Sequence, residues 1–201
     1  MINRRSDLTA DFIEHRIAQG PGALFVRDYP CNGPAFALLH GFPDDGHIYD
    51  DLIPHLAFAG RRTVTIDFPG FGASDRPGGT HYGFPQQVRD VEAVIAALSI
   101  DRAVLVGHDA GGPAAMNFAL RHPDTAHGVV PLNVFYGEAP GLPVPELIEL
   151  FSHPRLSAVA RHLLQSPEHF AWLLEFQREL LLADASPAGQ ERYSDSGVAS
   201  A

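Results

Sequence analysis

Short apolar runs alternate with amphipathic runs over most of the chain. The apolar runs are rich in β-branched and aromatic residues and predict strands at 12–18, 22–28, 35–40, 62–68, 101–107 and 128–136. Between them, apolar residues recur every three or four positions, which predicts helices at 46–60, 84–100 and 112–123. Elements in this order are typical of an α/β fold: a doubly wound, mostly parallel sheet covered on both faces.

This alternation stops at a segment rich in proline and glycine, 137–144. Helical periodicity follows at 145–152, 155–165 and 167–183, without a further strand-like run. Ser166-Pro167 is a typical helix start, with serine as N-cap and proline in the first turn. We therefore expect a core of residues 1–136, a hinge at 137–144, a helical segment at 145–183 and a flexible tail at 184–201.

Composition narrows the classes of function. The 201 residues are 45% hydrophobic and carry a net charge of −10 without a basic stripe, so we expect no nucleic-acid partner. No window reaches the roughly 18 apolar residues of a membrane span, and we expect no secretory signal, because no apolar segment follows the two arginines near residue 5. The one cysteine, Cys31, excludes an internal disulfide and favours a cytoplasmic location. Spacings typical of zinc sites are absent from the sequence, so we expect neither metal nor cofactor.

The stretch Gly107-His108-Asp109-Ala110-Gly111 joins a predicted strand to a predicted helix. Its spacing is that of a nucleophile elbow, with a carboxylate in place of serine. The flanking glycines permit a tight turn, and the helix N-terminus favours an ionised Asp109 at the carboxyl edge of the sheet. An ionised carboxylate attacks an electrophilic carbon without help from a base and forms an ester. The simpler interpretation is that Asp109 only caps the helix.

A second stretch, His40-Gly41-Phe42-Pro43, follows the predicted strand 35–40. The backbone N–H of Phe42, together with that of Ala110, is placed to form an oxyanion hole. An ordinary loop in which Asp44 or Asp45 caps the next helix is the alternative, and both interpretations are compatible. A third stretch, 67–77, is by itself only a loop of turn residues.

In combination these stretches resemble the α/β-hydrolase superfamily, and within it the epoxide hydrolases and haloalkane dehalogenases, which have an aspartate nucleophile. The resemblance covers roughly residues 20–136. It implies that Asp109 is the nucleophile, that the N–H groups of Phe42 and Ala110 form the oxyanion hole, and that a cis peptide precedes Pro43. It also implies that the helices after 140 begin a lid over the site. The residues that support the motifs are His40, Gly41, Pro43, Gly107, His108 and Gly111.

Departures from the family pattern rank the reactions. The family usually has a tryptophan after the nucleophile, whose indole N–H holds the halide in dehalogenases, whereas Ala110 offers no such donor. Epoxide opening therefore ranks above carbon–halogen cleavage, and ester or C–C hydrolysis, which usually uses serine, ranks lower. Tyr136 and Tyr193 are the candidates for the proton-donating tyrosines of epoxide hydrolases, although a structural or exposed position is favoured for both. Trp172, on an apolar helical face with Phe176, is a candidate pocket residue, although core packing is favoured.

The resemblance also implies a catalytic histidine after a final strand beyond the lid. No histidine of this sequence matches that position, because His153, His162 and His169 lie on predicted lid helices and His40 and His108 belong to the motifs as structural residues. Glu138 falls where some dehalogenases carry an alternative acid, although a loop glutamate is the simpler interpretation. We therefore expect a hydrolase truncated before its final strands, or one completed by another chain. The strand 128–136 would then be an apolar edge open to a homo-oligomer or a partner.

Two hypotheses remain. One is a hydrolase that acts on a small apolar electrophile through Asp109, without a metal or cofactor. The other is a catalytically incomplete protein of the same fold, which binds a small apolar ligand or a protein partner.

Overall fold

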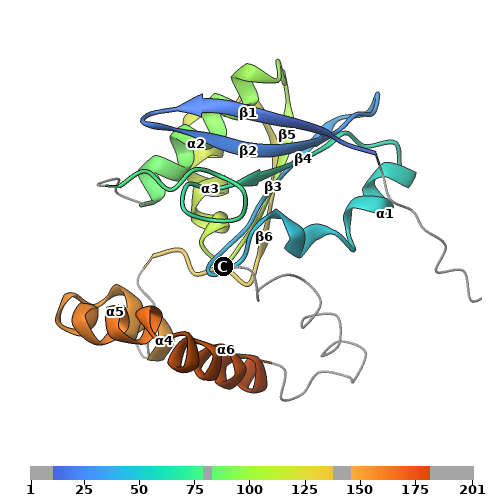
Figure 1. Ribbon diagram of the computed structural model, residues 1–201. Helices are drawn as coiled ribbons and strands as arrows, with labels where there is room; N and C mark the ends of the chain where they lie inside the picture. The colour runs from blue at the N-terminus through green and yellow to red at the C-terminus, as the bar shows by residue number, and fades with distance from the viewer. Residues whose placement is uncertain (1–10, 79–82, 138–145, 182–201) are drawn as a thin grey trace, which may run out of the picture. The chain divides into compact units, whose positions relative to one another are not determined.

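The computed structural model describes residues 11–78, 83–137 and 146–181 (Figure 1). The chain divides into two compact units, the first ending at Gly137 and the second containing helices α4 to α6. The expected tail at 184–201 and nearly all of the expected hinge at 137–144 lie outside the described residues, as do Glu138 and Tyr193.

The first unit is built on a six-stranded sheet in the order β1-β2-β4-β3-β5-β6 (Figure 1). Strands β1 and β2 form an antiparallel hairpin, β2 pairs antiparallel with β4, and all remaining neighbours are parallel. This confirms the predicted mostly parallel α/β sheet. The strands are β1 (Ile13–Gln19), β2 (Gly22–Tyr29), β3 (Ala35–Leu39), β4 (Thr63–Asp67), β5 (Ala103–His108) and β6 (Ala126–Leu132).

Alternating side chains of the strands build two cores. On one face, Leu39 and Leu105 pack with Val91 and Phe118 from two helices, α2 and α3. On the other face, Leu38 and Val106 pack with a 3-10 helix, η1, and with α1. The sheet is thus covered on both faces, as its apolar strands require. These helices are η1 (Gly46–Tyr49), α1 (Ile53–Phe58), α2 (Phe84–Ala97) and α3 (Gly111–Arg121).

Several predicted elements have different bounds in the structure, and three of these differences have a clear physical cause. The single helix expected at 46–60 is wrong: it is split into η1 and α1, because Pro54 lacks an N–H and is suited only to the first turn of a new helix. The helix expected at 84–100 ends at Ala97, and Ser99 follows with φ of 49°. The strand expected at 128–136 ends at Leu132, because Asn133 adopts the left-handed conformation with φ of 49°.

Strand β6 lies at one end of the sheet and is partly exposed. Its side chains Val130 and Leu132 are 41% and 38% exposed, and Phe135 and Tyr136 beyond the strand are exposed as well. Among the described residues, the expected apolar edge is therefore present. None of the helices in the described part of the chain has the length and apolarity needed to cross a membrane.

The second unit is helical. Ser166 precedes α6, and its hydroxyl accepts a hydrogen bond from the N–H of His169 at 3.4 Å, which confirms the predicted N-cap. The expectation of core packing for Trp172 is wrong, because its ring stacks on Phe176 but remains 63% exposed. Leu173, about 100° further around the helix, is the buried neighbour. The elements are α4 (Glu146–Ser152), η2 (Pro154–Leu156), α5 (Ser157–Gln165) and α6 (Pro167–Leu181).

Candidate active site

The three sequence motifs meet at one edge of the sheet. Strands β3, β4 and β5 are parallel, so their carboxyl ends share an edge. Residues 40–45 follow β3, residues 68–77 follow β4, and Asp109 follows β5. This is the edge at which open α/β sheets bind ligands.

Backbone contacts force a sharp turn at Asp109. This residue has φ of 48°, its N–H donates to the carbonyl of Leu132 at 3.1 Å, and its own carbonyl accepts from the N–H of Gly112 at 3.0 Å. A Cβ at Gly107 would lie 2.4 Å from the Gly111 carbonyl oxygen, and one at Gly111 would lie 2.2 Å from the Leu39 carbonyl oxygen. The flanking glycines are therefore required by close backbone approach as well as by the turn.

The Asp109 carboxylate is half-buried and directed at the candidate oxyanion hole. Its Oδ1 accepts a hydrogen bond from the N–H of Ala110 at 2.5 Å. Gly41 packs directly against it, since a Cβ there would lie 2.4 Å from the Asp109 Cβ. The next residue in that loop is Phe42, and the Phe42–Pro43 peptide is cis, as the resemblance implied. Helix α3 receives no capping bond from a side chain, so the capping interpretation of Asp109 is not supported.

His40 joins the loop after β3 to the loop after β4. Its ring is buried, with Nδ1 2.8 Å from the carbonyl oxygen of Gly41 and Nε2 accepting from the N–H of Phe68 at 3.0 Å. Burial lowers the pKa of His40, which keeps the ring neutral at neutral pH and fits a donating Nδ1 and an accepting Nε2. Both ring nitrogens are thus engaged in positioning the backbone.

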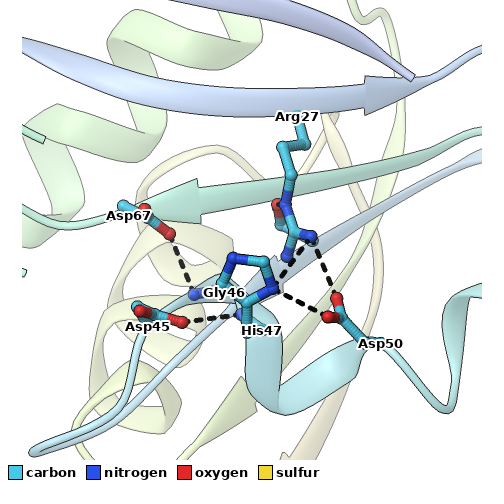
Figure 2. Close-up of polar contacts among 7 residues, drawn as sticks. Arg27, Asp45, Gly46, His47, Asp50 and Asp67 are labelled. Carbon is cyan, nitrogen blue, oxygen red and sulfur yellow. Dashed lines mark hydrogen bonds and ion pairs between the residues drawn. The ribbon is translucent and has the colours of Figure 1, made fainter. Parts of the chain in front are cut away.

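Asp67, at the end of β4, is a second anchor (Figure 2). Its Oδ1 accepts from the N–H of Gly46 at 2.8 Å, and its Oδ2 accepts from the N–H of Ala73 at 2.9 Å. Its backbone carbonyl accepts from the hydroxyl of Ser74 at 2.6 Å. Reasoning from the sequence treated this segment as only a loop and missed the anchor, because the partners come from separate segments.

Arg27 connects the sheet to η1 (Figure 2). Its side chain is buried, donating from Nε to the Thr65 hydroxyl at 3.2 Å and from Nη1 to Asp50 Oδ1 at 2.9 Å. His47 Nδ1 lies 2.7 Å from the other oxygen of Asp50. Asp45 accepts from the N–H of His47 at 2.8 Å and caps η1, which confirms one of the two capping candidates.

A second carboxylate lies beside the nucleophile candidate. Asp44 Oδ2 is 3.8 Å from His108 Nδ1, and the two side chains are 14% and 24% exposed. Burial raises the pKa of Asp44, the nearby His108 opposes that rise, and the charges of Asp45 and Asp109 add to it. The sequence predicted Asp44 only as a capping residue, because its proximity to His108 arises from the fold.

The candidate substrate-binding residues, Tyr136 and Trp172, make no described contact with Asp109. The hydroxyl of Tyr136 donates to Asn117 Oδ1 at 3.3 Å, and Trp172 belongs to the second unit. Within the described ranges, no group of three or more histidine, cysteine, aspartate or glutamate side chains is arranged to hold a metal ion. The structure thus brings together Asp109, Ala110, Gly41 and the loop of Phe42.

The sequence matches the α/β-hydrolase fold family over residues 34–193, so the chain belongs to this family. It is similar to epoxide hydrolase B of Mycobacterium tuberculosis (strain ATCC 25618 / H37Rv), with 39% identity over 142 residues, covering 66% of this chain and 40% of that protein. The chain therefore spans about 40% of the length of this curated relative.

Solved structures agree on the fold. An epoxide hydrolase from an endophytic Streptomyces superposes with a TM-score of 0.58 at 35% identity, covering 63% of this chain and 38% of that one. Cfl2 from Burkholderia cenocepacia superposes with a TM-score of 0.64 over 88% of this chain and 58% of that one, and its 24% identity supports the fold alone.

Proposed function

We propose that this chain is a hydrolase of the epoxide hydrolase type, in which Asp109 attacks a small apolar epoxide. The observation that carries the proposal is the half-buried Asp109 carboxylate on a glycine-flanked turn, with the Ala110 N–H bound to Oδ1. The similarity to proteins named epoxide hydrolases supports this choice within the family.

In this proposal the two oxygens of the Asp109 carboxylate have different tasks. Oδ2 attacks an epoxide carbon, the carbon–oxygen bond of the ring breaks, and an ester forms on Asp109. Oδ1 becomes the carbonyl oxygen of that ester and already accepts from Ala110. When water attacks the ester, negative charge develops on Oδ1, where this N–H and that of Phe42 stabilise it. This half-reaction needs a base for the water, which the proposal does not assign.

The surroundings favour an epoxide of low polarity. The Phe42 ring is 42% exposed and meets Phe71 edge-on, with ring centroids 6.3 Å apart, so the loop beside Gly41 presents apolar surface. Ala110 offers no side-chain donor to a departing halide, and carbon–halogen cleavage is therefore the second candidate reaction.

Intact-protein mass spectrometry after incubation with 1,2-epoxyhexane tests the proposal. Because Cys31 is an exposed thiol that also reacts with epoxides, all proteins carry Cys31→Ser. The parent should gain the mass of one epoxide or release the diol. Asp109→Asn should do neither, since Asn tolerates the left-handed backbone at this position but lacks the nucleophile. The surface variant Asp101→Asn should behave as the parent.

A catalytically incomplete binding protein is the competing function. It is favoured by His40, whose two ring nitrogens are already engaged by Gly41 and Phe68 and so cannot activate water. A folded parent protein that binds the epoxide without either adduct or diol would contradict the hydrolase proposal and support this one.

A further inference from the structure

The short segment that follows β6, residues 133–136, returns toward the first turns of α3. Asn133 adopts the left-handed conformation with φ of 49°, which ends the strand and turns the chain. Val134 is half-buried, whereas Asn133 and Phe135 on either side of it are exposed. The turn therefore directs one apolar side chain of this segment inward.

Val134 packs directly on the start of α3. A Cβ at Gly112, the buried second residue of this helix, would lie 2.2 Å and 2.6 Å from the two γ-methyl carbons of Val134. The valine thus fills the space that a side chain at position 112 would occupy. Because packed groups cannot interpenetrate, this contact fixes how closely the first turn of α3 approaches the segment after β6.

Polar contacts hold the chain on both sides of this valine. Before it, the carbonyl of Leu132 accepts from the N–H of Asp109 at 3.1 Å. Beyond it, the hydroxyl of Tyr136 donates to Asn117 Oδ1 at 3.3 Å, and Asn117 Nδ2 donates to the carbonyl of Pro113 at 2.7 Å. The segment is therefore tied to the backbone of the candidate nucleophile at one end and to helix α3 at the other.

We propose that Val134 is a positioning residue for the reaction at Asp109, because it sets where the first turn of α3 lies and with it the N–H of Ala110. This inference rests on the proposed function. The Asp109 carbonyl accepts from the N–H of Gly112 at 3.0 Å, and Asp109 Oδ1 accepts from the N–H of Ala110 at 2.5 Å. Both the backbone and the side chain of the nucleophile are thus bound to the turn that Val134 supports. A shift of this turn moves the Ala110 N–H away from the oxygen on which charge develops, where it is effective only at hydrogen-bond distance.

Three variants separate positioning from general stability. Val134→Ala removes both methyl groups, Val134→Thr keeps the branched shape, and Val94→Ala makes the same deletion at a buried valine of α2. In the Cys31→Ser background, we would measure adduct formation or diol release over a range of 1,2-epoxyhexane concentrations.

Val134→Ala should lower the maximal rate about tenfold and change the half-saturating concentration less than about twofold, because the donor and not the binding of the epoxide is displaced. Val134→Thr should stay within about twofold of the parent in both quantities. Val94→Ala should lose more stability than Val134→Ala, since Val94 is fully buried, and yet keep the maximal rate of the parent.

The amide resonance of Ala110 gives a readout that does not require reaction. Its proton should lie far downfield, because it bonds a carboxylate oxygen at 2.5 Å. Val134→Ala should move this resonance upfield as the bond lengthens, whereas Val134→Thr and Val94→Ala should leave it near the parent position.

Equal slowing by Val134→Ala and Val94→Ala, or an unchanged rate and an unchanged Ala110 resonance in Val134→Ala, would overturn the inference while leaving Asp109 as the nucleophile. A parent protein that gives neither adduct nor diol would contradict the proposed function itself. In that case an upfield shift of the Ala110 resonance in Val134→Ala alone would still support the role of Val134 in placing this N–H, and no shift would overturn it.

Discussion

The elbow at the end of β5 and the neighbouring strand β6 differ in how tightly the surrounding atoms constrain them. At the elbow, backbone atoms approach so closely that a methyl group at Gly111 would lie 2.2 Å from a carbonyl oxygen. In β6, a methyl group at Gly128 would meet nothing within 4 Å. The fold thus constrains the candidate nucleophile tightly and leaves the adjoining strand with room to change.

Hydrogen bonding shows the same contrast. Around the elbow, Asp67 and His40 each join two backbone segments through their side chains. In β6, the carbonyl of Leu132 accepts a hydrogen bond from the N–H of Asp109. Because the backbone groups of successive residues in a strand point to opposite sides, those of the preceding residue, Pro131, point away from β5. Proline has no N–H there, which makes this edge a poorer template for another strand. The expected pairing through β6 remains a prediction, and Pro131 weakens it.

The largest effect is expected where a glycine is replaced at the elbow. Gly111→Ala should lower the free energy of unfolding by about 3 kcal/mol or more, because the added methyl group meets the backbone oxygen of Leu39. Gly128→Ala, the matched change in β6, should alter it by less than about 1 kcal/mol. Urea denaturation measures both values. Similar losses in the two variants would remove the contrast between the regions.

A buried carboxyl group on α2 should make stability depend on pH. Burial raises the pKa of Asp90 to about 6, against the opposing hydrogen bond from Gln86. Because this pKa is higher in the folded than in the unfolded protein, the stability contributed by this group is greatest below pH about 4 and is lost as pH rises through about 6.

Asp90→Asn should therefore be more stable than the parent at pH 8 by up to about 3 kcal/mol, with the difference vanishing near pH 4. Urea denaturation at a series of pH values measures the difference. A difference that is constant with pH would show that Asp90 does not titrate in this range.

The next effect concerns the anchor at the end of β4. Asp67→Asn replaces one of two accepting oxygens with an amide group, so the N–H of Gly46 or of Ala73 loses its partner. Stability should fall by about 2 kcal/mol, and adduct formation at Asp109 should slow, because Gly46 follows the loop of Phe42. Asp101→Asn, at an exposed carboxylate, is the comparison variant. Normal labelling in a destabilised Asp67→Asn protein would show that Asp67 contributes to stability but not to the arrangement of the candidate site.

The smallest effect is expected on the exposed face of β6. Val106 and Val130 are partners across β5 and β6, yet they are 4% and 41% exposed. Val130→Thr should change stability by about 0.5 kcal/mol at most, whereas Val106→Thr should cost about 1–2 kcal/mol for a buried hydroxyl. Thermal unfolding of both variants makes the comparison, and a larger loss at Val130 would show that this side chain is covered in solution.

The sequence predicted those features that depend on local pattern. Glycines around Asp109 predicted the turn, and Ser166-Pro167 predicted a capped helix. It did not predict that Asp67 joins Gly46 to Ala73, or that Asp44 faces His108, because these partners come from different strands and loops. The end of β6 was also missed: Val134 and Phe135 continue an apolar run, and only the backbone conformation of Asn133 ends the strand.

The central claim is that the Asp109 carboxylate is the nucleophile, and peptide mapping tests it most directly. The Cys31→Ser protein is treated with 1,2-epoxyhexane, quenched in acid, digested and analysed by tandem mass spectrometry. The account predicts an added epoxide on the peptide that contains Asp109, as an ester that is cleaved by mild base, and its absence after unfolding the protein before treatment. An adduct confined to histidines or to other carboxylates, or labelling that persists in unfolded protein, would contradict the account.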